Sequence, residues 1–311
     1  PSITTDDPMT QHAIAGVLPV VHMPYTESGE IDLNTMEKQI DYLFEMGADG
    51  FCLALVSDLF RLSEEERATL PAQLCKFARQ RGPVVINVAA ESTRQARLYA
   101  RAAEEGGAAA LMAIPPISRG LGEDELHAYF TAMLEEVDIP IFVQDASSYV
   151  GKPMSIEFQA SLFAEYGQRV LFKPEASPLG PCISALRTAT QGQASIFEGS
   201  GGVLLIDSFR RSIAGTIPGV ELLDGTTALW NALKAGDEER AYQLYWPICA
   251  LITLQLQGGL DGFIVSERYI MHKRGLFPNQ VHRGPLSFSL DVTMCDEIDR
   301  LMVHLEHALQ G

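Results

Sequence analysis

The chain has 311 residues, of which 47% are hydrophobic and 20% are charged, and its formal net charge is −17. No segment is rich in lysine or arginine, so this charge argues against a nucleic-acid partner and against binding to an anionic membrane surface. No apolar run reaches the roughly 18 residues that a membrane-spanning helix needs, which argues against a membrane protein.

The cysteines and the first residues favour the cytoplasm. The five cysteines are odd in number and widely spaced, and none forms a CxxC pair, as is typical of reduced thiols. Residues 1–11 carry Asp6 and Asp7 but no basic residue, so they lack the form of a signal peptide. We therefore expect a cytoplasmic protein, and its overall charge does not exclude an anionic small molecule as ligand.

Short apolar runs alternate with segments of helical periodicity through the first 225 residues. The apolar runs are 16–23, 50–56, 84–90, 108–114, 140–144, 170–173, 194–197 and 213–217. The helical segments are 33–46, 63–81, 92–105, 123–137, 155–166, 178–190 and 202–211. Apolar runs without polar alternation are typical of parallel strands that are buried on both faces. Eight such units in this length predict an α/β fold, a closed (β/α)8 TIM barrel, over residues 12–225.

The strand pattern stops after Asp224. Four further helical segments follow, at 227–235, 238–257, 262–274 and 292–309. No linker or low-complexity tract separates them from the barrel. We therefore expect residues 226–311 to form a C-terminal helical extension of the same domain.

Barrel enzymes carry their chemistry at the carboxyl ends of the strands, where this chain places Lys173 and Glu175. Positions i and i+2 of a strand point to the same side, so the two side chains share a face. Burial disfavours the ammonium form of Lys173 and favours the nucleophilic amine, which can form a Schiff base with a carbonyl compound. The adjacent carboxyl can move protons. The alternative is a solvated lysine paired with a surface glutamate.

Other candidates at strand ends are less specific. His22 follows the first apolar run and is either a base or a hydrogen-bonded structural residue. The turn that contains Glu198 and Gly199 either cradles an anion or only permits a tight turn. His304 and His307 lie three residues apart on the last helix without a third ligand nearby, so we expect no metal site.

Several motifs resemble the dihydrodipicolinate synthase/N-acetylneuraminate lyase family of class I aldolases. They are Gly16–Pro19, Gly29–Asp32, Leu62–Glu66, Pro115–Pro116 and Phe172–Ser177, and the likeness runs from about residue 13 to the C-terminus. The resemblance implies a (β/α)8 barrel with a C-terminal helical extension, assembled as a homotetramer (a dimer of dimers) without metal or cofactor. It also implies that Lys173 forms a Schiff base with a small-molecule 2-keto acid.

The chain departs from the common pattern of that family at its acid–base positions. Where the family commonly has Gly-Thr-Thr-Gly-Glu, this chain has Ala54-Leu55-Val56-Ser57-Asp58. Gln144 stands in place of the tyrosine that ends the fifth strand, and Ile117 in place of the tyrosine after Pro115-Pro116. An amide does not titrate near neutrality, so Gln144 cannot relay protons as a phenol does.

One branch of the family, the 2-keto-3-deoxy-L-arabonate dehydratases, is similar at these same positions. The similarity lies in Val143–Ala146, Phe172–Glu175 and Glu198-Gly199. It implies a Schiff-base dehydratase of a 2-keto-3-deoxy sugar acid, in which Lys173 attacks the ketone, Glu175 is the general base at C3, and Gln144 binds substrate or a water. The strand-two loop would receive the substrate carboxylate. The residues expected to bind substrate are Val56, Ser57, Asp58, Glu198, Gly199 and His22.

Two other functions remain open. The first is an aldolase, lyase or synthase that acts on another 2-keto acid of the pyruvate class. The second is a binding protein on the same barrel that has kept the lysine and lost the chemistry; the missing tyrosines favour it, whereas Glu175 speaks against it.

Overall fold

The computed structural model describes residues 14–311, so the expectations for residues 1–13, including the start of the barrel at residue 12, lie outside the described residues. Within that range eight short strands form. They are β1 (Gly16–Val17), β2 (Phe51–Leu53), β3 (Val84–Asn87), β4 (Ala110–Ala113), β5 (Ile141–Asp145), β6 (Val170–Pro174), β7 (Phe197–Glu198) and β8 (Gly215–Thr216). Each lies inside or within one residue of an apolar run expected from the sequence.

The strands close into a cylinder. One hydrogen-bonded set runs β2-β3-β4-β5-β6 and the other β1-β8-β7, and every pairing is parallel. Isolated parallel bridges join the two sets, from Val20 to Cys52 on one side and from Phe172 to Ile196 on the other. The predicted TIM barrel is therefore confirmed.

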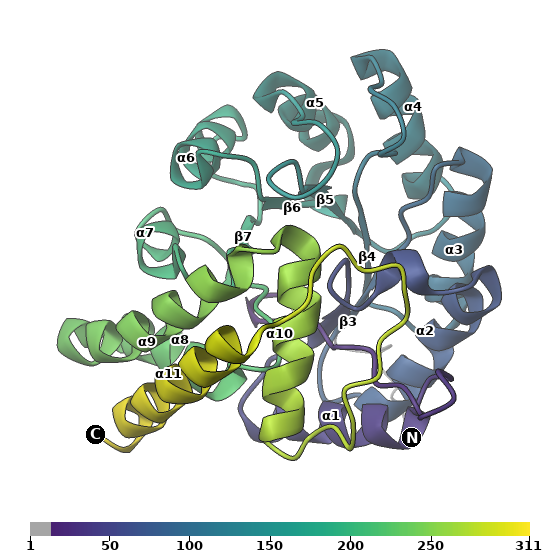
Figure 1. The fold of residues 1–311 in the computed structure, drawn as a ribbon. Helices are drawn as coiled ribbons and strands as arrows, with labels where there is room; N and C mark the ends of the chain where they lie inside the picture. The colour runs from purple at the N-terminus through teal and green to yellow at the C-terminus, as the bar shows by residue number, and fades with distance from the viewer. Residues whose placement is uncertain (1–13) are drawn as a thin grey trace, which may run out of the picture.

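A ring of helices surrounds the strands (Figure 1). It consists of α1 (Leu33–Glu45), α2 (Glu64–Ala78), α3 (Thr93–Glu105), α4 (Glu123–Leu134), α5 (Ile156–Tyr166), α6 (Leu179–Ala189), α7 (Leu205–Phe209) and α8 (Leu223–Ala235), with 3₁₀ turns η1 (Leu59–Arg61) and η2 (Gly167–Arg169). α7 is much shorter than the expected helix 202–211, because Gly201 and Gly202 have φ of 70° and 117° and lie in a turn outside the helical region.

Three more helices complete the chain: α9 (Glu238–Leu256), α10 (Gly259–Lys273) and α11 (Val292–Gln310). The expected division after residue 225 falls inside α8, so we propose that the extension begins after that helix. α11 and α8 both pack against α9, whereas α10 and the segment 274–291 pass across the carboxyl end of the barrel (Figure 1). No helix of the described residues is long and apolar enough to cross a membrane.

Side chains alternate between two apolar layers along each strand. Leu18, Cys52, Val85, Phe142 and Leu171 belong to the cluster that fills the inside of the cylinder. The intervening residues pack outward against the helices, which is the period-two pattern of a strand buried on both faces. This alternation decides which strand-end side chains point into the barrel.

Candidate active site

Strand β6 delivers the lysine into the barrel. Leu171 faces the inner cluster and Phe172 the outer one, so Lys173 points inward, as Leu171 does. Only 4% of Lys173 is exposed, and its Nζ lies 3.0 Å from Oε1 of Glu175, which is itself buried. The two groups lie on one face, as the i and i+2 spacing predicts. The alternative of a solvated surface pair is wrong.

Gln144 orients the carboxylate of Glu175. β5 and β6 place Gln144 opposite Lys173 in the register. Its Nε2 donates to Oε2 of Glu175 at 2.5 Å, and its Oε1 accepts from Asn87 at 3.5 Å. Lys173 therefore contacts one carboxylate oxygen of Glu175 and Gln144 donates to the other. These two contacts fix the orientation of the Glu175 side chain.

Gly199 leaves the space that Lys173 and Glu175 occupy. A Cβ at this position would lie 2.5 Å from Cε of Lys173 and 2.6 Å from Oε1 of Glu175. Such distances are well inside van der Waals contact, so a larger residue would displace the reactive pair. Gly199 lines the site through its backbone, as expected of a substrate-contacting position.

Glu198 does not serve as a free ligand for substrate. Its Oε1 accepts from the amide of Ser200 at 2.6 Å, and its Oε2 accepts from the hydroxyl of Thr216 at 2.7 Å. Complete burial, and then the charge of Glu175, raise the pKa of Glu198, whereas these hydrogen bonds oppose the shift. Because the carboxylate of Glu198 occupies the amide of this turn, the turn is not an anion cradle in this structure.

The strand-two loop offers a different set of donors from the predicted one. The hydroxyl of Ser57 donates to the carbonyl of Val21 at 2.5 Å and accepts from the amide of Ala54, while the amide of Ser57 donates to the carbonyl of Ala54. Ser57 is therefore structural, and the prediction that it receives a carboxylate is wrong for this geometry. Val56 does line the pocket, and no described residue accepts from the amides of Leu55 or Val56.

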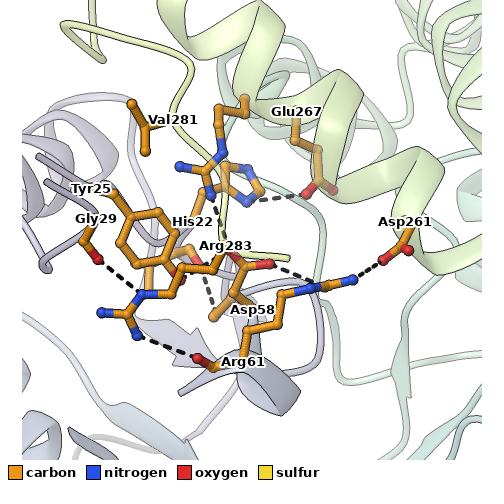
Figure 2. Close-up of polar contacts among 12 residues, drawn as sticks. His22, Tyr25, Gly29, Asp58, Arg61, Asp261, Glu267, Val281 and Arg283 are labelled. Atoms are coloured by element: carbon orange, nitrogen blue, oxygen red, sulfur yellow. Dashed lines mark hydrogen bonds and ion pairs between the residues drawn. The ribbon is translucent and has the colours of Figure 1, made fainter. Parts of the chain in front are cut away.

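Asp58 forms ion pairs and His22 contacts buried carboxyl groups, and neither residue is part of the pocket lining (Figure 2). Asp58 lies 3.1 Å from Nη2 of the buried Arg268 and 3.3 Å from Nη1 of Arg61, and it accepts from the hydroxyl of Tyr25 at 3.0 Å. Its expected role in substrate binding does not fit these contacts. His22 lies between two buried carboxylates and likewise does not reach the pocket directly.

A pocket opens at the carboxyl end of the strands. Lys173, Glu175 and Gln144 line it, together with Val56 and Gly199. Five of the nine predicted site residues therefore line the pocket. The other four, Ser57, Asp58, Glu198 and His22, are not among the lining residues.

Two protic side chains in the pocket were not predicted from the sequence. Tyr149 follows β5 in the loop toward α5, and its phenol has a raised pKa because of burial and the neighbouring carboxylates of Glu175, Glu198 and Glu267. Glu267 comes from α10 and is 3% exposed. Tyr149 lies only five residues after Gln144, so its position in the loop that follows β5 could have placed it near the site. Nothing in the sequence around Glu267 indicates that it lies there.

Comparison with known proteins agrees with the fold. The model of the dihydrodipicolinate synthetase family matches residues 13–302. An L-2-keto-3-deoxyarabonate dehydratase of Azospirillum brasilense is 27% identical over 280 residues, which cover 87% of this chain and 88% of the relative.

Solved structures show the same fold. The dihydrodipicolinate synthase of Rhodopseudomonas palustris superposes with a TM-score of 0.85 at 26% identity, over 94% of this chain and 97% of that one. The synthase of Acinetobacter baumannii, solved in complex with pyruvate, gives a TM-score of 0.84 at 20% identity, over 94% and 98% of the two chains.

Proposed function

The chain belongs to the dihydrodipicolinate synthetase family, and on that premise we propose that it is a Schiff-base dehydratase of a 2-keto-3-deoxy sugar acid, such as 2-dehydro-3-deoxy-L-arabonate. Membership makes it a lyase of the class I aldolase type. The observation that carries the dehydratase proposal is the contact of Lys173, Glu175 and Gln144 in one pocket, with an amide where a phenol is common in the family. The relative from Azospirillum brasilense supports the same substrate class.

The reaction begins with proton transfer from Lys173 to Glu175. The 3.0 Å contact lets the carboxylate take a proton from the ammonium, which frees the amine to attack the C2 ketone. Loss of water from the adduct gives an iminium ion. The iminium withdraws electrons from C3, so Glu175, once it has passed its first proton to the departing water, accepts the C3 proton and leaves an enamine. The enamine expels the C4 hydroxyl, whose oxygen must gain a proton from a general acid to leave as water, and hydrolysis of the resulting imine frees Lys173.

The substrate carboxylate is expected at the strand-two loop. The amides of Leu55 and Val56 at the pocket wall are free to donate to it, and two amides on one turn form a site that suits an anion. Gly199 leaves room beside Lys173 for the C1–C3 part of the substrate.

Borohydride reduction tests the Schiff base. Wild-type protein treated with pyruvate and borohydride should gain the mass of a reduced adduct on a peptide that contains Lys173, whereas Lys173→Ala should gain none and should lose turnover. An unmodified wild-type protein would refute the proposal. Incubation with 2-dehydro-3-deoxy-L-arabonate then distinguishes dehydration, which releases no pyruvate, from cleavage of the C3–C4 bond, which does.

The second candidate is an aldolase or lyase of a related 2-keto acid. It is favoured by Tyr149, whose phenol lines the pocket and is the kind of group that carbon–carbon cleavage uses in this family. Release of pyruvate from a hydroxylated keto acid would support it. A binding protein that has kept only the barrel would show neither adduct nor turnover.

We also propose a cytoplasmic homotetramer, a dimer of dimers. The rings of Tyr242, Tyr245 and Trp246 lie against one another on α9, and Trp246 is 63% exposed, which is unusual for so large an apolar side chain on a free surface. All five cysteines are free thiols, in keeping with a reducing compartment. Sedimentation analysis of wild type and Trp246→Glu tests the assembly, and a monomeric wild type would contradict it.

A further inference from the structure

The pocket contains a second carboxyl group that the scheme above leaves unused. Glu267 is buried, lines the pocket and comes from α10, which passes over the mouth of the barrel. Lys173 and Glu175 come from β6 and the residue after it. A substrate joined to Lys173 therefore lies between the strand that provides one carboxyl and the helix that provides the other.

His22, which does not line the pocket, contacts Glu267 (Figure 2). Nδ1 of His22 lies 3.2 Å from Oε2 of Glu267, which leaves Oε1 of Glu267 for the pocket. The backbone of His22 is itself clamped by Gln39, whose amide accepts from the nitrogen of His22 and donates to its carbonyl, both at 2.8 Å. The imidazole of His22 is therefore held beside Oε2 of Glu267, the carboxyl oxygen that we place away from the substrate.

A second buried carboxyl lies on the other side of the same ring. Nε2 of His22 lies 3.1 Å from Oε2 of Glu221, and the amide of Val220 points at the same nitrogen from 3.2 Å. Because an N–H donates to Nε2, the ring proton belongs on Nδ1, facing Glu267. The other oxygen of Glu221 accepts from Gln255 at 3.3 Å.

These three side chains form a cluster of close polar contacts rather than a metal centre, with Nε2 of His22 beside Glu221 and Nδ1 beside Glu267. His22, Glu221 and Glu267 are close enough together to suggest a metal site. The two carboxylates, however, face opposite nitrogens of the ring, whereas one ion binds one nitrogen of a histidine. Burial, and then the charges of Glu221 and Asp58, raise the pKa of Glu267 well above its usual range, which favours the protonated carboxyl.

We propose that Glu267 is the general acid that protonates the departing C4 hydroxyl, and that His22 is the positioning residue that holds it. The proposal rests on the dehydratase function proposed above. In the step, the C4–O bond breaks, its electron pair stays on the hydroxyl oxygen, and the proton of Glu267 joins that oxygen to give water. The C3 proton is meanwhile on Glu175. Release of that proton to water, and return of one proton to Glu267, restore both carboxyls, so the net change is loss of one water from the substrate.

A substrate analogue with a better leaving group separates this role from the rest of the mechanism. Fluoride is a far better leaving group than hydroxide and needs much less help from an acid, so a 2-keto acid with fluorine at C4 bypasses the protonation step. Glu267→Gln should lose about 10²- to 10⁴-fold in turnover of the hydroxyl substrate, the range for a lost general acid, and should release fluoride within a few-fold of wild type. His22→Asn should show the same selective loss, since a merely structural defect would slow both reactions.

Two control measurements do not involve C4 and show whether a loss of turnover is specific to protonation of the leaving group. Borohydride trapping of pyruvate shows that the protein is folded and that Lys173 reacts, and exchange of the C3 protons of pyruvate with deuterium shows that Glu175 acts as a base. Both activities should persist in Glu267→Gln. If wild type itself failed to trap pyruvate, the proposed function would fall and not only this step. If trapping succeeded but Glu267→Gln turned over the hydroxyl substrate within threefold of wild type, the role of Glu267 would be refuted.

Tyr149→Phe completes the set, because Tyr149 is the other unassigned protic side chain in the pocket. We expect it to leave the ratio of hydroxyl to fluoride turnover as in wild type. A selective loss of hydroxyl turnover in Tyr149→Phe, with no such loss in Glu267→Gln, would assign the acid to the phenol instead. Should Glu267→Gln fail to fold, the same ratio measured on His22→Asn decides the question.

Discussion

Gln144 lies opposite Lys173 in the register of β5 and β6, yet its amide donates to Glu175, at 2.5 Å, rather than to substrate space. The phenol common at this position in the family is replaced by a group that cannot titrate but can fix a carboxylate. Under the proposed function, acid–base chemistry moves from the fifth strand to the end of the sixth, where Glu175 is 3.0 Å from the amine of Lys173.

Glu175→Gln should abolish turnover while leaving the barrel intact. The substitution keeps the size of the side chain but removes its ability to take the ammonium proton and the C3 proton, so we expect kcat to fall by about 10²- to 10⁴-fold. Deuterium exchange at C3 of pyruvate should slow in parallel. Circular dichroism is expected to match wild type, and turnover close to wild type would exclude Glu175 as the base.

Gly199→Ala should inactivate the protein through crowding alone. The new Cβ would lie 2.5 Å from Cε of Lys173, so the lysine must move away from Glu175. We expect at least a 10²-fold loss of kcat and a weakened borohydride adduct, since misplacement by about 1 Å can cost 10²-fold. Gly122→Ala is the matched control, because a Cβ there meets nothing within 4 Å. Equal activity of the two variants would mean that the pair tolerates displacement.

Asp58→Asn should destabilise the fold rather than weaken substrate binding. Asn tolerates the left-handed φ of 58° at this position, so the backbone can persist, but Arg268 loses the anion that lies 3.1 Å from its Nη2. Removing one partner of a buried ion pair typically costs about 3–5 kcal/mol. Urea denaturation should show this loss, and Asp58→Asn with Arg268→Met should recover much of it. An increase in KM at unchanged stability would instead restore Asp58 as a substrate ligand.

His282 should make the segment across the barrel mouth sensitive to acid. Burial, and then the charges of Arg268 and Arg61, lower the pKa of His282 to about 4 from its ordinary 6.5. Because the pKa of His282 is lower in the folded state, the unfolded state binds a proton first as the pH falls. The contribution of neutral His282 to the free energy of unfolding is therefore complete above pH 6.5 and is lost as the pH falls toward 4. We expect His282→Gln to flatten the decline of thermal stability between pH 6.5 and 4. His307→Gln, at an exposed position, is the control and should keep the wild-type profile.

The barrel and the juxtaposition of Lys173 and Glu175 could be predicted from the sequence. Eight apolar runs could be counted because strands buried on both faces have no polar alternation, and the closed cylinder follows from that count. The two-residue spacing of Lys173 and Glu175 placed them on one face, because side-chain direction along a strand is a local property. Gln144 could be located at the site for the same reason, although not its hydrogen bond to Glu175.

Which polar side chains line the pocket depends on long-range contacts and could not be predicted from the sequence. Ser57 and Asp58 follow a strand end as a ligand would, but their partners, Val21 and Arg268, come from other elements. Glu267 enters the pocket from a helix 94 residues after Lys173 in the chain, and no local pattern records where that helix crosses the barrel. Long-range packing sets these contacts, since a polar side chain turns toward whichever partner satisfies it once water is excluded.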